Sequence, residues 1–162
     1  PYQKHRLPSI VFATEYDLGT NGFAYSDKDV VNYDGTKFTR WNKGNQMRND
    51  GVDIVSCTDE ITNGFQVSFI EEGEWLQFTV DVKNSSTFDV GIRYSSEKLE
   101  GKLYLEQEGK KISETIELTS TGGETIWKTV ILKNVALKKG SNTIRVHFLG
   151  GNFNLNYIEF IK

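Results

Sequence analysis

Hydrophobic and polar residues alternate along several segments of the chain, as they do in strands with one buried face. In residues 74–82 (EWLQFTVDV), every second residue from Leu76 onward is apolar. Residues 86–96 (STFDVGIRYSS) and 142–148 (NTIRVHF) follow the same rule. Because successive side chains of a strand point to opposite faces, these segments are predicted to be half-buried strands.

No segment carries a convincing helical pattern. The longest helix-compatible stretch, residues 95–111, is interrupted by Gly101, and its apolar residues Leu103 and Leu105 lie two positions apart, as in a strand. Gly, Asn and Ser residues punctuate the chain between the strand-like segments. Short strands separated by such turns predict an all-β fold, an antiparallel sandwich or barrel with essentially no helix.

The last predicted strand carries asparagines, which are depleted in strands. In residues 150–160 (GGNFNLNYIEF), Asn154 and Asn156 alternate with apolar residues, and Asn152 precedes them. A carboxamide donates and accepts hydrogen bonds without the desolvation cost of a charge, which suits the hydroxyl groups of a sugar. The alternative is that these amides cap a sheet edge or bond to the backbone of a loop.

A long polar segment covers residues 26–50. It is rich in Asn, Asp and Lys, and it contains Trp41. Long irregular segments often carry functional residues. A large aromatic side chain among polar neighbours therefore favours a position that faces a ligand.

Composition excludes several classes of protein. The chain has 19 basic and 22 acidic side chains and a formal net charge of −3, which argues against a nucleic-acid partner. No apolar run approaches the roughly 18 residues of a membrane span, so no membrane partner is expected. The single cysteine, Cys57, and the two histidines lack partners at metal-ligand spacing. No nucleophile with a base and no distinct carboxylate pair stands out, so no catalytic residue is assigned.

Six motifs, taken in order along the chain, resemble those of family 6 carbohydrate-binding modules. They are VFATEYDLGTNGFAYSD (11–27), MRNDGVDIV (47–55), FIEEGEWLQFTVDV (69–82), TGGETIWKTV (121–130), LKKGSNTIRVHF (137–148) and GGNFNLNYIEF (150–160). The resemblance implies a jelly-roll β-sandwich over residues 10–162, with residues 1–9 as a linker or tail. It also implies a secreted, extracellular or cell-surface module that is covalently linked to a catalytic domain. The start at Pro1 rather than Met favours an excerpt from a longer protein.

Members of this family hold a sugar ring between two aromatic side chains in a cleft among the loops, beside an asparagine that orients it. The resemblance places that asparagine at Asn154, with Asn152 as the second choice. One clamp position is occupied by Met47, which offers no flat ring. In the second clamp loop, Glu124 stands at the first tryptophan position and Trp127 at the second.

Other residues could compensate for the missing rings. Trp41 is expected to line the ligand surface, Arg48 to flank it, and Glu124 to accept hydrogen bonds from sugar hydroxyls. Trp127 is equally compatible with core packing at the start of a strand. Some relatives also bind glycan on the concave sheet face, where Trp75 is a candidate, although a structural role is favoured for it.

Many relatives carry a structural calcium ion near both termini. In this chain Phe12 and Thr14 stand where the family has glutamates, so two charges are lost. Calcium prefers six to eight oxygen ligands. The resemblance leaves a possible calcium site formed by four other residues, which are Glu15, Asp17, Asn156 and Glu159.

Together these features predict a non-catalytic carbohydrate-binding module that brings a linked secreted glycoside hydrolase to a polysaccharide. The candidate polysaccharides are β-glucan, xylan and agar-type galactan. The alternative is a structural or interdomain β-sandwich that has lost its sugar cleft. Met47 and Glu124 suggest this alternative, because they replace the aromatic residues of the clamp.

Overall fold

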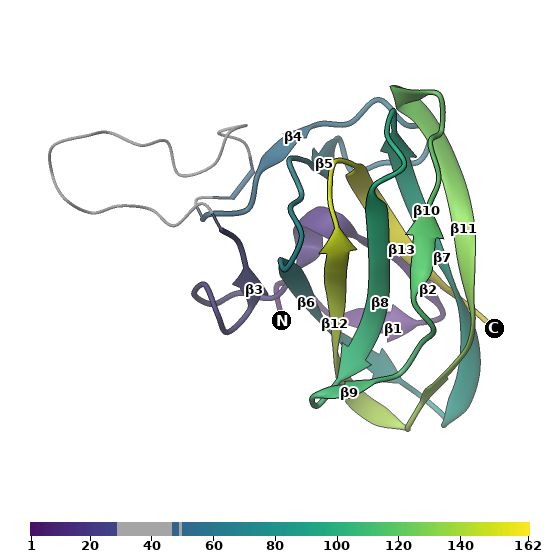
Figure 1. The fold of residues 1–162 in the computed structure, drawn as a ribbon. Coiled ribbons are helices and arrows are strands. Elements are labelled where there is room, and N and C mark those ends of the chain that lie inside the picture. Colours follow the sequence, from purple (N-terminus) through teal and green to yellow (C-terminus); the bar gives the residue numbers. More distant parts are fainter. Residues whose placement is uncertain (29–46, 49) are drawn as a thin grey trace, which may run out of the picture.

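Two β-sheets face each other in the computed structural model, which describes residues 1–28, 47–48 and 50–162 (Figure 1). Sheet A has seven strands: β1 (His5–Leu7), β3 (Tyr25–Ser26), β6 (Trp75–Val82), β8 (Gly101–Gln107), β9 (Lys110–Lys111), β10 (Ile116–Leu118) and β12 (Gly140–Gly150). Sheet B has six strands: β2 (Ser9–Phe12), β4 (Ile54–Ser56), β5 (Phe65–Val67), β7 (Ser86–Ser96), β11 (Gly123–Leu137) and β13 (Asn154–Ile161).

The strand order explains how distant parts of the chain meet. Sheet A runs β1-β6-β12-β8-β10, with β3 also paired to β6 and β9 to β8. Sheet B runs β11-β7-β13-β5-β4, with β2 also paired to β13. All the pairings are antiparallel except that of β1 with β6. The predicted all-β jelly-roll sandwich is confirmed, and the one helical element of the described residues is a 3-10 turn, η1 (Ala13–Glu15).

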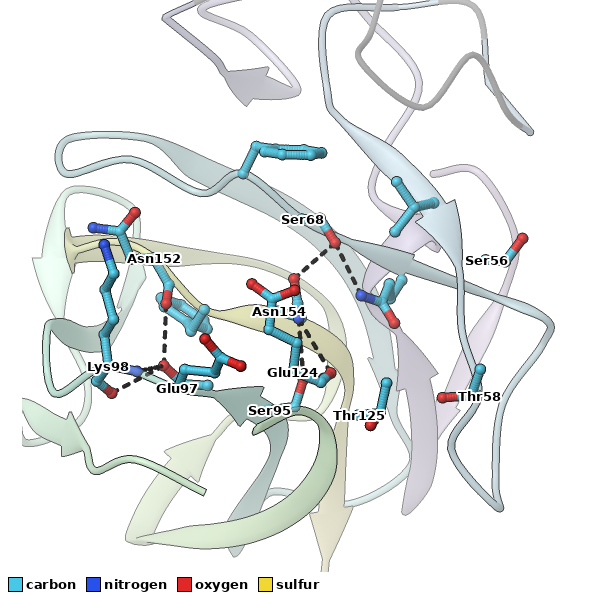
Figure 2. A pocket seen from close by; sticks show the side chains of 15 residues that line it. Ser56, Thr58, Ser68, Ser95, Glu97, Lys98, Glu124, Thr125, Asn152 and Asn154 are labelled. Atoms are coloured by element: carbon cyan, nitrogen blue, oxygen red, sulfur yellow. Dashed lines mark hydrogen bonds between the residues drawn. The ribbon is translucent and has the colours of Figure 1, made fainter. Parts of the chain in front are cut away.

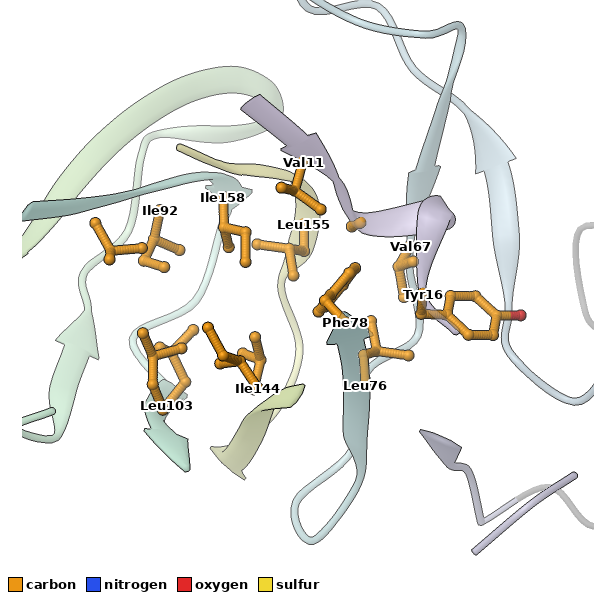
Figure 3. Packing of buried hydrophobic residues seen from close by; sticks show 14 of the residues in the cluster. Val11, Tyr16, Val67, Leu76, Phe78, Ile92, Leu103, Ile144, Leu155 and Ile158 are labelled. Atoms are coloured by element: carbon orange, nitrogen blue, oxygen red, sulfur yellow. The ribbon is translucent and has the colours of Figure 1, made fainter. Parts of the chain in front are cut away.

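The core lies between the sheets and follows the predicted alternation. Leu76, Phe78, Val80 and Val82 of β6 are all buried, while the residues between them are partly exposed. Figure 3 shows Ile92, Leu155 and Ile158 of sheet B packed over Leu103, Ile144 and Phe78 of sheet A. Each large apolar side chain that is fully buried in this way contributes about 1.5–3 kcal/mol.

The first nine residues differ from the prediction of a linker or tail. His5–Leu7 pairs in parallel with Val80–Val82 of β6, and Leu7 is buried in the core. Three residues are too short a run to show strand periodicity, and the pairing partner lies more than seventy residues away. This part of the N-terminal segment therefore belongs to the sandwich.

Asp17 completes the edge of β6 between the strands β3 and β1. These two strands pair with opposite ends of β6 and leave its middle uncovered. The Asp17 carboxylate fills that gap by accepting hydrogen bonds from the Thr79 backbone N–H (3.0 Å), the Thr79 hydroxyl (2.7 Å) and the Gln77 amide (3.1 Å). Its own N–H donates to the Gln77 carbonyl oxygen at 2.7 Å. A carboxylate thus substitutes for a missing strand.

Asp17→Ala is expected to lower the free energy of unfolding by about 1–3 kcal/mol, because the partly buried Thr79 N–H loses its acceptor. Urea denaturation at neutral pH measures the change. Asp81→Ala, on the half-exposed face of the same strand, is the matched control and is expected to change stability by less than about 0.5 kcal/mol. Equal effects of the two substitutions would contradict the role assigned to Asp17.

Candidate functional site

An open cleft lies at one end of the sandwich, the upper end in Figure 1, where β5 and β7 end and β11 and β13 begin. Its volume is about 410 Å³, which is in the range of small-ligand sites. The residues that line it are Val55, Ser56, Thr58, Gln66, Ser68, Phe69, Ser95, Ser96, Glu97, Lys98, Glu124, Thr125, Asn152, Phe153 and Asn154.

Two glycines bring the loops around the cleft close together. A Cβ at Gly150 would lie 1.9 Å from the Glu100 carbonyl oxygen, and one at Gly151 would lie 2.3 Å from the Ile70 carbonyl oxygen. The backbone N–H of Asn152 donates to the same Ile70 oxygen at 3.0 Å. Only glycine permits this approach, so the turn between β12 and β13 is held against the turns before β6 and β8.

Asn154 lies at the floor of the cleft in a network of hydrogen bonds (Figure 2). Its Oδ1 accepts from the Ser68 hydroxyl at 2.8 Å, and its Nδ2 donates to the Ser95 hydroxyl at 3.1 Å and to the Glu124 carbonyl oxygen at 3.4 Å. Ser68 in turn accepts from the Gln66 amide at 3.0 Å. The side chain is 9% exposed, so it is fixed in one orientation with one edge open to the cleft.

Phe69 is the aromatic side chain that the sequence did not single out. It lines the cleft next to Ser68 and is 53% exposed. Its φ of 53° lies in the left-handed region, which a bulky residue rarely adopts. Backbone strain of this kind is concentrated at functional sites, which favours a functional role for Phe69.

The charged residues that line the cleft are Glu97, Lys98 and Glu124, which are exposed and are called its rim below. Figure 2 shows Lys98 and Asn152 at one end, Ser56 and Thr58 at the other, and Asn154 between them. Glu124 lines the cleft as predicted, and its carbonyl oxygen accepts from Ser95 and Asn154. Asn152 also lines it and donates through Nδ2 to the Glu100 carboxylate.

Trp127 does not line the cleft. A bulge in β11 between the pairs Gly123–Ser96 and Trp127–Ser95 displaces Glu124 and the two residues after it from the strand register. Glu124 thereby reaches the cleft, whereas Trp127 is half-buried and its Nε1 is a buried donor without a partner among the described residues. Trp127 belongs neither to the lining of the cleft nor to the hydrophobic cluster between the sheets and the residues packed on it, so both of its alternatives stay open.

Arg48, which was expected to flank the ligand, does not line this cleft, and its side chain is buried against other residues. The guanidinium donates to the carbonyl oxygens of Tyr16 and Asp17, lies 3.5 Å from the ring centroid of Tyr16, and pairs with Asp50 at 3.2 Å. Met47 is 40% exposed but is not a lining residue of the cleft. Trp41 lies outside the described residues.

Asn156 serves the fold instead of a ligand. Its Nδ2 donates to Asp59 Oδ2 at 2.8 Å and to the Ile61 carbonyl oxygen at 2.7 Å. Asp59 also accepts two hydrogen bonds of 2.7 Å from Arg93 and one of 2.9 Å from the Glu60 backbone N–H. Burial alone would raise the pKa of Asp59, but these hydrogen bonds outweigh it and hold the pKa below its ordinary value.

The four residues of the predicted calcium site do not fit a common ion. Asp17 accepts hydrogen bonds from Thr79 and Gln77, and the Nδ2 of Asn156 donates to Asp59 and Ile61, while the Asn156 Oδ1 is buried without a hydrogen-bond partner among the described residues. Glu15 accepts from the Phe12 backbone N–H, and Glu159 lies within β13. In the described part of the chain no three His, Cys, Asp or Glu residues come together as a metal site. The calcium ion thus remains an expectation from the resemblance, without support from the placement of these residues.

A row of aromatic rings crosses the outer face of sheet A. Trp75 and Tyr104 both pair with His147 in the strand register, and their rings lie 6.2 Å and 5.0 Å from the His147 ring. The Arg145 guanidinium lies 4.0 Å from the centroid of the Trp75 ring. Glu74, next to Trp75, is buried and accepts from the backbone N–H groups of Lys28 and Glu71, a structural role.

Comparisons with known proteins agree with the β-sandwich fold. The chain shares 29% identity with a carbohydrate-binding module of lichenase 5A from Cellvibrio mixtus, solved in complex with cellotriose, at a TM-score of 0.61 over 69% of this chain and 87% of that chain. A β-1,3-glucan-binding family 6 module from Bacillus halodurans is 16% identical, with a TM-score of 0.69, over 99% of this chain and 100% of that one.

A third similar structure belongs to a larger protein. A glycoside hydrolase family 43 arabinoxylan arabinofuranohydrolase from Bacillus subtilis, in complex with cellotetraose, is 18% identical at a TM-score of 0.68. The match covers 99% of this chain and 28% of the enzyme.

Two further results bear on the class of protein. Among the described residues, no helix is long and apolar enough to cross a membrane. No curated protein matches the sequence at a significant level.

The family model described as carbohydrate binding module (family 6) matches residues 44–162, most of the chain. The chain therefore belongs to the family 6 carbohydrate-binding modules, which bind sugars and are not catalytic.

Proposed function

We propose that this chain binds a β-glucan, xylan or agar-type galactan in the cleft around Asn154 and so holds a covalently linked, secreted glycoside hydrolase at its substrate. The observation that carries the proposal is the pairing of an exposed aromatic ring, Phe69, with a fixed amide, Asn154, in one open cleft. We further propose an extracellular or cell-surface location for the assembly.

The cleft combines the two contacts that a pyranose ring requires. Its apolar face packs on an aromatic ring, which buries area while the edges of the sugar keep their hydroxyl groups in solvent. The hydroxyls then pair with polar side chains around the ring, which this cleft offers as carboxylate and hydroxyl groups. Tethering an enzyme to polysaccharide raises the local concentration of its substrate without any new catalytic group.

The similar structures support two parts of the proposal. The modules from Cellvibrio mixtus and Bacillus halodurans are described with cellotriose and with β-1,3-glucan, which favours a β-glucan for this chain. The Bacillus subtilis enzyme carries the same fold within a longer hydrolase, which supports a linked catalytic domain.

Affinity electrophoresis through gels that contain β-1,3-glucan, β-1,4-glucan, xylan or agarose tests the binding directly. Retardation in at least one gel is expected, together with loss of retardation when the matching soluble oligosaccharide is added. Unchanged mobility in every gel would contradict the proposal.

The position of the site is tested by two substitutions on different faces. Asn154→Ala is expected to weaken binding about tenfold, because it removes the group that holds Ser68 and Ser95 in place on the cleft floor. Trp75→Ala, on the outer face of sheet A, is expected to leave the affinity unchanged. If Trp75→Ala alone abolished retardation, the site would lie on the sheet face instead.

The structural or interdomain alternative makes a different prediction. It was motivated by a lost cleft, and the open volume beside Asn154 weighs against it. If the chain only supported a neighbouring domain, its removal from the full-length protein would lower the melting temperature of that domain and leave polysaccharide binding unchanged.

A further inference from the structure

The neutral polar groups of the cleft floor are already committed to one another. The Ser68 hydroxyl donates to Asn154, the Ser95 hydroxyl donates to the Glu124 carbonyl oxygen at 2.6 Å, and the Asn154 amide donates to Ser95 and Glu124. The Ser96 hydroxyl is held by the backbone of Lys98 and Asn152. A ligand therefore meets a floor with few free donors.

The charged groups of the rim are free. Among the described residues, the side chains of Glu97, Lys98 and Glu124 form no hydrogen bond or ion pair, although all three line the cleft and are exposed. Carboxylates accept hydrogen bonds that are roughly twice as strong as those between neutral groups. The side-chain contacts that remain available to a sugar at this cleft thus include these three charged groups, beside the exposed hydroxyls of Thr58 and Thr125.

The charge around the cleft is predominantly negative. Two of the three free rim groups are carboxylates. The adjoining turns add Glu71, Glu72 and Glu100, which are exposed as well. These turns are fixed beside the cleft, since Ile70 and Glu100 both bond to Asn152. Several like charges at the mouth of one cleft attract cations and repel anions, and salt screens the effect.

We propose that this cleft selects its ligand by charge, through the carboxylates of Glu97 and Glu124. Glycans with protonated amino sugars bind more tightly than neutral glycans. Glycans with uronate or sulfate groups are excluded. The inference rests on the proposed function, because it assigns a ligand class to the same cleft. Asn154 acts as a positioning residue for the floor, and Phe69 supplies the apolar face.

Isothermal titration with three tetrasaccharides of one linkage tests the proposal: β-1,4-glucose, β-1,4-glucosamine and β-1,4-glucuronic acid, in mildly acidic buffer of low salt. The glucosamine tetramer is expected to bind about three- to tenfold more tightly than the glucose tetramer, with the difference reduced in high salt. The glucuronic acid tetramer is expected to bind at least about tenfold more weakly than the glucose tetramer.

The double variant Glu97→Gln, Glu124→Gln separates charge from shape. It is expected to bring the glucosamine-to-glucose affinity ratio to within about twofold of one, because the amides keep the size of the side chains but not their charge. Glu108→Gln is the matched control, since Glu108 is exposed in the turn between β8 and β9, at the opposite end of the sandwich. It should keep the wild-type ratio.

Three results would overturn the inference. The first is that the glucosamine tetramer does not bind. The second is that it binds no more tightly than the glucose tetramer at low salt. The third is that the double variant keeps the wild-type glucosamine-to-glucose affinity ratio. Retardation in the polysaccharide gels is a separate observation, so the proposed function can stand while this inference fails.

Discussion

Arg93→Met is expected to lower the free energy of unfolding by about 2–4 kcal/mol, somewhat less than a fully buried ion pair because the arginine is partly exposed. Arg93 makes two hydrogen bonds of 2.7 Å to Asp59, whose side chain is only 3% exposed. Without the guanidinium, this carboxylate stays buried with an incomplete set of partners. Urea denaturation of both proteins at neutral pH measures the loss.

The effect of Arg93→Met should depend on pH in a defined direction. The pKa of Asp59 is lowered in the folded chain, so its contribution is complete above the ordinary aspartate pKa of about 4 and is lost as the pH falls through the folded value. The difference between wild type and variant is therefore largest near neutral pH and shrinks in acid. A difference that stayed constant from neutral pH to strongly acidic pH would contradict the assigned role of Asp59.

Lys133→Met is the matched control for this prediction. Lys133 of β11 pairs with Asp89 of β7 at the same 2.7 Å, but the lysine side chain is 67% exposed. Exposed pairs contribute little to stability, so no resolvable change is expected. If both variants lost the same stability, burial of Asp59 would not be the source of the effect.

Phe69→Ala is expected to weaken polysaccharide binding about 10- to 100-fold, because Phe69 offers an exposed aromatic ring on the cleft surface. Affinity electrophoresis in the gel that retards the wild type most strongly measures the change. Phe23→Ala is the control, because Phe23 is 76% exposed and does not line the cleft.

A second substitution separates the ring of Phe69 from its backbone. Phe69→Gly removes the same ring and relieves the positive φ of 53°, which glycine adopts without strain. It is expected to bind as weakly as Phe69→Ala and to be at least as stable as the wild type in urea. Wild-type affinity in either variant would remove Phe69 from the site.

The alternation of apolar residues predicted the long strands well, because a strand with one buried face must alternate. The segments 74–82, 86–96 and 142–148 became β6, β7 and most of β12. The short strand β1 escaped because three residues carry no period, and its partner lies far along the chain. The sequence therefore predicted the strands that have one buried face and are long enough to show the alternation.

Part of the candidate site could be predicted, and the rest depends on backbone detail. Asn154, Asn152 and Glu124 were expected at the cleft and line it. Phe69 was missed because it adopts a left-handed conformation just after β5, and the bulge before Trp127 brings Glu124 to the cleft while Trp127 stays in register with Ser95. Neither the left-handed conformation of Phe69 nor the bulge in β11 can be recognised from the alternation of apolar and polar residues.

Polar residues near the motifs were weaker guides than the apolar pattern. Arg48, Asp17 and Asn156 were assigned to ligand or metal, yet each is committed to hydrogen bonds within the fold. A polar side chain near a functional motif can equally well complete a sheet edge or hold a loop. The distinction requires its partners, which a single sequence does not contain.

Titration of the ¹⁵N-labelled chain with the best-binding oligosaccharide, followed by amide chemical shifts, tests the central claim most directly. The largest shifts are expected at residues 66–69, 95–98 and 152–154, which surround Asn154, and small shifts at Trp75, Tyr104 and His147. Large shifts confined to those three residues of sheet A, with none around Asn154, would contradict the assignment of the sugar to the cleft.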